Sequence, residues 1–189
     1  MAVTSADRGR EVRRRLADSA AELIAELGWS GVSTRVLAER AGVTPGLVHY
    51  HFPSLQVLLA EAAVGAIQRL ADGLGGLLER ARTPEDAVDV LLGALSEYSG
   101  TDPLSLLITE TFLATTRDDD LRTAVSTVIT GFRRTLATWL ADRGAPTPEA
   151  TAAVLAAAVD GLMLHRALLP EPTAEVVAPV LRRLVAVRP

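Results

Sequence analysis

The chain has 189 residues, of which 49% are hydrophobic and only 4% aromatic, and its formal net charge is -4. It contains no cysteine, which excludes disulfides, thiolate metal sites and a cysteine nucleophile. With so few aromatic residues, the core must be built from leucine, valine and alanine. This composition favours helices over sheets, because alanine and leucine are strong helix formers.

The amino terminus is polar and arginine-rich, without the apolar run of a signal peptide. No segment reaches the roughly 18 apolar residues of a membrane span. We therefore expect a soluble, cytoplasmic protein that does not enter the membrane. The net negative charge argues against non-specific coating of DNA. Residues 1–52 nevertheless carry seven arginines against six acids, so a polyanion would bind this part of the chain.

The first predicted helix covers about residues 8–27, with Gly28 at its end. One face of this helix carries an apolar stripe at helical spacing. The stripe consists of Val12, Leu16, Ala20, Leu23, Ile24 and Leu27. The opposite face begins with Arg8, Arg10, Arg13, Arg14 and Arg15. These arginines either contact a polyanion or form a solvated face that the acids among them partly neutralise.

Residues 33–52 indicate two short helices joined by a tight turn. Ser33 can cap the first helix, and Gly42 lies where a sharp turn between helices favours a positive φ. Thr44 can cap the second helix through its side-chain oxygen. Pro45 then takes the first helical position, where its missing N–H costs nothing. This layout is typical of a helix-turn-helix motif, whose second helix lies in the major groove.

The remaining helix starts share one pattern. Thr83, Asp102 and Thr147 each place a side-chain oxygen before a proline, a combination that suits the first turn of a helix. The acidic run 118–120 suits the positive end of a helix dipole. A long helix also opens at residues 53–54. The expected helices run from there to about 82, and then over about 84–98, 103–115, 118–142, 148–168 and 174–187.

Two of these helices contain residues that disfavour regular helix. Glycines at 73, 75 and 76 predict a bend in the long helix, although a straight and tightly packed helix is also compatible with the sequence. Pro179 should kink the last helix or mark its true first turn. Nine helices are predicted in total, three small ones first and larger ones after.

The helix-turn-helix segment resembles the DNA-binding signature of TetR/AcrR-type transcriptional regulators. The likeness is carried by residues 31–35, 37–38, 41–44 and 50–54, within a detailed match over about residues 10–60. The resemblance implies an all-α protein with two domains. A three-helix DNA-binding domain would occupy 1–53, and a six-helix domain that binds an effector and forms a homodimer would occupy 54–189.

The resemblance also implies which residues contact DNA. Phosphate contacts fall to Ser33 and Thr34 at the start of the motif's first helix. The groove-facing positions are Thr44, Pro45, Gly46 and Leu47, and base edges or backbone are contacted by His49, Tyr50 and His51. Four positions depart from the residues that are common in the family. Pro45 and Leu55 each lie where lysine is common, Leu47 where a small polar residue is common, and His49 where tyrosine is common. Compensating cations could be Arg35, together with Arg10, Arg13 or Arg14.

Bulky or polar side chains are scarce on the apolar helices of the second half, and they are candidates for an effector cavity. The candidates are Thr111, Phe112, Thr115, Ile129, Phe132, Arg133 and Met163. Ordinary core packing is the alternative for each. A dimer seam of four helices is expected on the alanine-rich face 152–158 and the last helix. Its candidates are Leu155, Val159, Leu162, Arg166, Leu181 and Leu184, unless this face merely covers its own core.

Together these features predict a ligand-responsive DNA-binding regulator. We expect a homodimeric repressor that a small, largely apolar effector releases from a palindromic double-stranded operator. The alternative is a helical small-molecule-binding protein with weakened DNA contacts that acts through protein partners. We expect no enzyme, because no nucleophile–base motif is recognisable, and no cofactor. We also expect no metal site, because His49 and His51 point to different helix faces.

Overall fold

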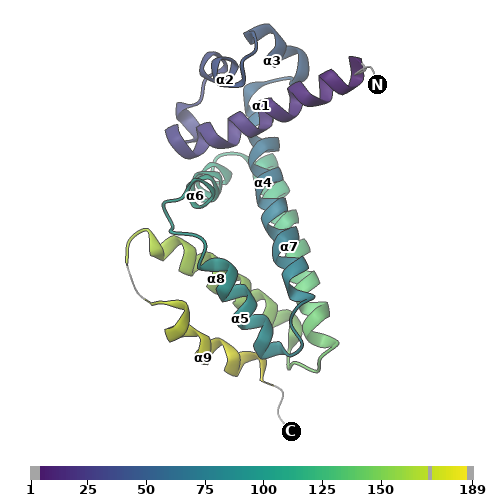
Figure 1. Cartoon of the computed structure of the whole chain (residues 1–189), viewed down its shortest axis with the longest axis vertical. Coiled ribbons are helices and arrows are strands. Elements are labelled where there is room, and N and C mark those ends of the chain that lie inside the picture. Colours follow the sequence, from purple (N-terminus) through teal and green to yellow (C-terminus); the bar gives the residue numbers. More distant parts are fainter. Residues whose placement is uncertain (1–4, 170–171, 187–189) are drawn as a thin grey trace.

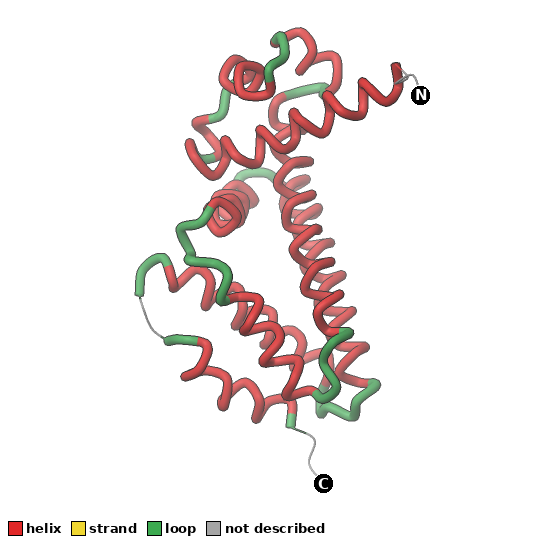
Figure 2. Tube along the Cα trace, in the orientation of Figure 1, coloured by secondary structure: helices red, strands yellow, loops and turns green. Residues whose placement is uncertain are grey.

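The computed structural model describes residues 5–169 and 172–186, and all regular elements in these ranges are helical (Figures 1 and 2). They are α1 (Ser5–Leu27), the 3₁₀ helix η1 (Trp29–Gly31), α2 (Thr34–Ala41), α3 (Pro45–His51), α4 (Leu55–Leu78), α5 (Pro84–Leu95), α6 (Pro103–Thr115), α7 (Asp119–Ala141), α8 (Pro148–Arg166) and α9 (Ala174–Val185). The predicted all-α class is confirmed. The first helix is long rather than small, with 23 residues.

Helices α1, α2 and α3 form a unit at one end of the molecule, and α4 runs from it into the larger body (Figure 1). The predicted apolar stripe of α1 supplies much of the core of this unit. Its fully buried members are Leu16, Ala20, Leu23 and Ile24. Leu27 is an exception, because it is 48% exposed and its Cβ lies beside Gly31 of the 3₁₀ turn instead of the core.

Most predicted caps are present. The Ser33 hydroxyl accepts the Val36 N–H, Thr83 and Asp86 form a capping box, and Asp102 caps α6. Asp118, in the acidic run expected to suit the helix dipole, also caps α7 with its side chain. Gly42 has the expected positive φ of 64°. These bonds satisfy backbone donors that a helix cannot satisfy itself.

Two predicted side-chain caps are wrong, at Thr44 and Thr147. Thr44 precedes α3, but its backbone carbonyl, not its side chain, accepts the Leu47 N–H. Pro45 has no N–H of its own, so α3 begins with one donor fewer to satisfy. Thr147 has a left-handed backbone with φ 45°, whereas side-chain capping requires an extended residue.

The long helices differ from their predicted courses in detail. α4 is continuous through the glycines at 73–76 and ends at Leu78, before the predicted end near 82. An ideal Cβ at Gly75 would lie 4.0 Å from Thr135 of α7, so packing between α4 and α7 supports the helix there. α5 and α8 end at Leu95 and Arg166, two to three residues early.

The last helix settles one open alternative. Pro179 lies in the middle of α9 and not in its first turn. The predicted end of this helix at 187 lies outside the described residues.

Helix α4 belongs to both cores. Its first half places Leu58, Leu59 and Ala62 in the core with α1, and its second half places Leu74 and Leu78 in the core of the larger body. In that body, α7 packs most extensively against α8 and α4. The predicted domain boundary between residues 53 and 54 therefore stays a prediction. None of the described helices is both long and apolar enough to span a membrane.

Candidate DNA-binding surface and effector cavity

Helix α3 is anchored on one side and exposed on the other. Val48 and Phe52 are only 1% exposed and fix the helix to the core. Six of the predicted DNA contacts in and beside α3 are exposed, namely Thr44, Pro45, Gly46, Leu47, His49 and Tyr50. Tyr50 is the most prominent, with 81% of its surface exposed. An exposed helix face with imidazole and phenol groups can donate and accept hydrogen bonds at base edges or phosphates.

Arg13 holds the carboxyl-terminal end of α3 in place. Its Nη1 donates to the His51 carbonyl at 2.8 Å, its guanidinium lies 4.1 Å from the Phe52 ring centre, and its Nε donates to Glu61 of α4 at 3.1 Å. His51 is half-buried, and its ring meets the Tyr50 ring edge-on at 5.1 Å between centres. Arg13 is thus already paired within the protein, and its role as a compensating cation on DNA stays a prediction.

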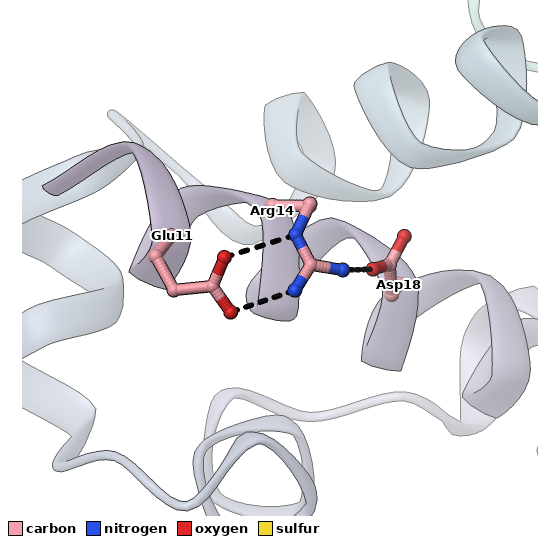
Figure 3. Close-up of polar contacts among 3 residues, drawn as sticks. All are labelled: Glu11, Arg14 and Asp18. Atoms are coloured by element: carbon pink, nitrogen blue, oxygen red, sulfur yellow. Dashed lines mark hydrogen bonds and ion pairs between the residues drawn. The ribbon is translucent and has the colours of Figure 1, made fainter. Parts of the chain in front are cut away.

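Two other predicted compensating cations also have acidic partners. Arg14 lies between Glu11 and Asp18, with its nitrogens 2.6 Å from Glu11 Oε1 and 2.9 Å from Asp18 Oδ2 (Figure 3). The hydrogen bond from Arg14 lowers the pKa of Glu11. Arg10 pairs with Asp7. Arg10 and Arg14 therefore fit a solvated face that nearby acids neutralise better than they fit the role of cations free to bind DNA.

The start of α2 retains the polar groups expected there. Ser33 and Arg35 are exposed and Thr34 is half-buried. The Ser33 oxygen accepts the Val36 N–H, which leaves the hydroxyl hydrogen able to donate to a phosphate. Arg35 makes no hydrogen bond or ion pair with the residues of 5–169 and 172–186. Among the predicted compensating cations, Arg35 is therefore the one without such a partner in these ranges.

A mostly apolar cavity of about 70 Å³ lies between α4, α5, α7 and α8. Three of the predicted effector contacts, Ile129, Phe132 and Met163, line it. Its volume is well below the roughly 300–1,000 Å³ of drug-sized ligand sites. A large effector would require these helices to move apart.

The other four predicted effector contacts are not in the cavity wall. Thr111 is buried and donates to the Leu107 carbonyl, and Thr115 donates to the Phe112 carbonyl. Phe112 itself packs in the core, and Arg133 is half-buried with its Nε buried and unbonded. The polarity of the two threonines suggests ligand anchors, but each hydroxyl is satisfied by its own helix backbone.

Besides several aliphatic residues, sequence reasoning missed the two polar side chains of the cavity wall, Tyr98 and Asp160. Tyr98 lies in the α5–α6 loop, where no periodicity marks it. Asp160 carried a signal, because it is the sole acid of the apolar segment 152–164. Burial raises its pKa, while the charge of Arg133 opposes that effect.

The predicted dimer residues mostly serve the chain's own core. Leu155 and Leu181 are buried and Leu162 packs against core residues. Val159 lines the cavity, and Arg166 donates to the carbonyls of Leu95 and Tyr98. Only Leu184 is clearly exposed, at 40%. The prediction for Leu155 and Leu181 is wrong because the most apolar face of each helix turns inward.

A different apolar face of α8 and α9 is exposed. On α8 it includes Val154 and Leu164, with Ala150 and Ala157 on the same side. On α9 it consists of Val176, Val180 and Leu184, which are 40–60% exposed. The α9 residues recur every four positions and those of α8 lie four, three and seven positions apart, so they form a stripe on each helix.

Two family models match the chain. Residues 16–62 match the model described as "Bacterial regulatory proteins, tetR family", and residues 82–187 match the model "Tetracyclin repressor-like, C-terminal domain". Together they include α2, α3, the second half of α1, the start of α4, and the cavity helices α5, α7 and α8.

Curated relatives agree with these matches. The chain is 31% identical over 80 residues to the HTH-type transcriptional regulator BetI of Rhizobium meliloti, which covers 42% of this chain and 39% of BetI. It is 25% identical over 183 residues to an uncharacterised HTH-type transcriptional regulator of Mycobacterium tuberculosis, covering 93% and 92% of the two chains.

Solved structures share the fold over nearly the whole chain. A transcriptional regulator from Streptomyces coelicolor A3(2) aligns with a TM-score of 0.75 and 28% identity, over 93% of this chain and 98% of that one. The multidrug binding protein EbrR, complexed with imidazole, aligns with a TM-score of 0.68 and 30% identity, over 94% and 96%.

Proposed function

The chain belongs to the TetR family of bacterial transcriptional regulators, and from this premise we propose that it is a homodimeric repressor. It binds a palindromic operator through α3 and leaves it when a small effector enters the cavity. The observation that carries the proposal is the exposed face of α3, fixed from behind by Val48 and Phe52. Proteins of this kind insert such a helix in the major groove.

Each part of the motif has a role on the duplex. Ser33, Thr34 and Arg35 bind phosphates and set the register. Thr44, Pro45 and Gly46 begin α3 and let the backbone approach the groove. Leu47 contacts a thymine methyl, and His49 and Tyr50 bind base edges or backbone. Because His51 is half-buried against Tyr50, it contributes by placing that ring as well as by any contact of its own.

The dimer forms through the exposed apolar stripes of α8 and α9. Val154 and Leu164 on α8 and Val176, Val180 and Leu184 on α9 would face water in a monomer, and they lie on one side of each helix. Two copies of this helix pair make a four-helix seam, and a two-fold axis matches the two halves of a palindrome. This seam replaces the one centred on Leu155 and Leu181.

The cavity between α4, α5, α7 and α8 is the effector site. Its wall is apolar apart from Asp160 and the Tyr98 hydroxyl. EbrR, whose fold this chain shares, is a multidrug binding protein complexed with imidazole, which supports a small-molecule site here as well. Since the cavity is small, a bound effector spreads the helices around it. That movement reaches the DNA-binding unit through α4, which lies in both cores.

Selection of bound DNA from a random pool tests the repressor proposal. The full-length protein should enrich an inverted repeat whose half-sites lie about 34–36 Å apart, roughly 10–10.5 base pairs or a multiple. Absence of any enriched sequence would contradict it.

A second candidate function is a small-molecule-binding regulator with weakened DNA contacts that acts through protein partners. The pairing of Arg10, Arg13 and Arg14 with acids of the chain itself favours it. A salt titration of binding to the selected DNA separates the two functions. A repressor with several phosphate contacts loses affinity steeply as salt rises, whereas the second candidate shows weak binding at every salt concentration.

A further inference from the structure

The cavity wall contains one charged group, the carboxylate of Asp160. The remaining side chains of the described wall are aliphatic or aromatic, apart from the Met163 thioether and the phenol of Tyr98. Asp160 is half-buried and makes no hydrogen bond or ion pair with any residue in the described part of the chain. A carboxylate in such surroundings is costly unless an opposite charge or several donors accompany it.

Arg133 is the nearby positive charge, but it does not satisfy Asp160. It affects the carboxylate through space only, since no ion pair within 4.0 Å joins the two side chains, and Arg133 is not part of the wall. The carboxylate therefore faces the cavity without a direct partner.

Two aromatic rings share the cavity with this carboxylate. Tyr98 from the α5–α6 loop and Phe132 from α7 both line it. Aromatic faces attract organic cations, and the attraction grows when the site is dry. An acid and two rings in an otherwise aliphatic wall form the usual chemistry of a site for an alkylated ammonium group.

We propose that the effector is a compact organic cation, an ammonium group with apolar substituents, and that Asp160 is its counter-ion beside Tyr98 and Phe132. This inference rests on the proposed effector site and names its ligand class. A purely apolar effector would dry the cavity and leave the carboxylate unpaired. An anionic effector would meet a like charge at short range, where the low dielectric strengthens repulsion. The volume of about 70 Å³ selects for a small ligand.

Two probes of equal shape and different charge test the proposal. Choline carries a positive nitrogen where 3,3-dimethylbutan-1-ol carries a neutral carbon, and both lack an aromatic ring, in keeping with the small cavity. Their binding to the full-length protein is measured by isothermal titration calorimetry, without DNA. The variants are Asp160→Asn, which removes the charge, and Asp160→Glu, which keeps it. Glu149→Gln is the matched control, because Glu149 is exposed at the other end of α8.

The wild-type protein and Glu149→Gln should bind the cation at least tenfold more tightly than the neutral probe. Asp160→Asn should lose this preference while its affinity for 3,3-dimethylbutan-1-ol stays, and Asp160→Glu should keep a preference for the cation. Equal binding of the two probes by the wild type, binding of neither, or an unchanged preference in Asp160→Asn overturns the proposal. If Asp160→Asn does not fold, the proposal is judged by whether the wild type and Asp160→Glu prefer the cation over the neutral probe. Since DNA is absent, failure here leaves the repressor proposal standing, and failure to bind an operator leaves this one standing.

Discussion

The backbone N–H of Trp29 donates a hydrogen bond to the carboxylate of Glu110, with 2.8 Å between the nitrogen and Oε2. Trp29 begins the turn after α1, and Glu110 lies on α6 of the larger body. The Trp29 indole donates in turn to Gln56 on α4 at 3.0 Å. Trp29 therefore connects the DNA-binding unit to both α4 and α6. α6 follows directly on the loop that carries Tyr98 of the cavity.

Replacing Glu110 should loosen this connection. Glu110→Ala removes a charged acceptor from a half-buried N–H, which should lower the free energy of unfolding by about 1–3 kcal/mol. Glu110→Gln keeps an acceptor oxygen and should lose less. Urea unfolding measures both variants. If the two variants and the wild type unfold at the same urea concentration, the hydrogen bond contributes nothing to stability.

Gly100 and Gly42 form a matched pair for a second prediction. Both have positive φ, 83° and 64°. A Cβ at Gly100 would lie 2.5 Å from the Ala167 backbone nitrogen, whereas a Cβ at Gly42 would meet nothing within 4 Å. Gly42→Ala should therefore cost only the left-handed strain, about 1–2 kcal/mol. Gly100→Ala should cost at least about 1–3 kcal/mol more, because backbone atoms must shift. Equal losses on thermal or urea unfolding would show that the α5–α6 loop moves freely away from α8.

The dimer seam can be tested with single charges. Leu164→Glu and Val180→Glu place a carboxylate on the exposed stripes of α8 and α9, so they should give folded monomers. Leu113→Glu is the control, since Leu113 is equally exposed, at 52%, but lies on α6 away from the stripes. Sedimentation velocity measures the outcome. A dimer that survives both substitutions, or one lost equally in Leu113→Glu, argues for an interface elsewhere.

The cap of α6 should make stability depend on acid. Burial of Asp102 raises its pKa, but hydrogen bonds from the Ser105 hydroxyl and from the N–H groups of Ser105 and Ser99 outweigh burial and lower it overall. Because folding lowers this carboxyl pKa, the ionised Asp102 stabilises the protein fully at pH values above the ordinary pKa near 3.8. This stabilisation is lost as the pH falls below that value.

Asp102→Asn isolates this effect. Both oxygens of Asp102 accept hydrogen bonds, from Ser105 and Ser99, and asparagine has one acceptor oxygen and no charge, so the variant should be less stable than the wild type at pH 7. Between pH 4 and pH 2 its free energy of unfolding should fall less steeply than that of the wild type. Urea unfolding over this pH range measures both proteins, and parallel slopes would exclude a contribution from this carboxylate.

The local features of the DNA-binding unit could be predicted from the sequence, because they depend on neighbours along the chain. Ser33, Gly42 and Pro45 act within one helix turn, and all three adopt the predicted places. Thr44 shows the limit of such reasoning. A capping residue can be recognised, but whether its side chain or its backbone takes the N–H depends on the geometry of the turn.

The cavity and the dimer face could be predicted only in part, because they depend on how helices turn toward one another. Ile129, Phe132 and Met163 lie in the cavity, but the polar candidates of α6 bond to their own backbone. Leu155 is as apolar as Leu164, yet the first is buried and the second is 49% exposed. Hydrophobic periodicity identifies both apolar faces of such a helix, but it does not show which face packs against the core.

The most direct test of the repressor account is the affinity of α3 variants for the selected operator, measured by fluorescence anisotropy at one fixed salt concentration. His49→Ala combined with Tyr50→Ala should weaken binding at least about tenfold, since each lost base contact costs about 1–3 kcal/mol. Both side chains are exposed, so the dimer and its unfolding midpoint should be unchanged. Val57→Ala, on the exposed start of α4, serves as the control and should bind as the wild type does. If the double variant binds the operator with wild-type affinity, α3 does not read DNA and the account is wrong.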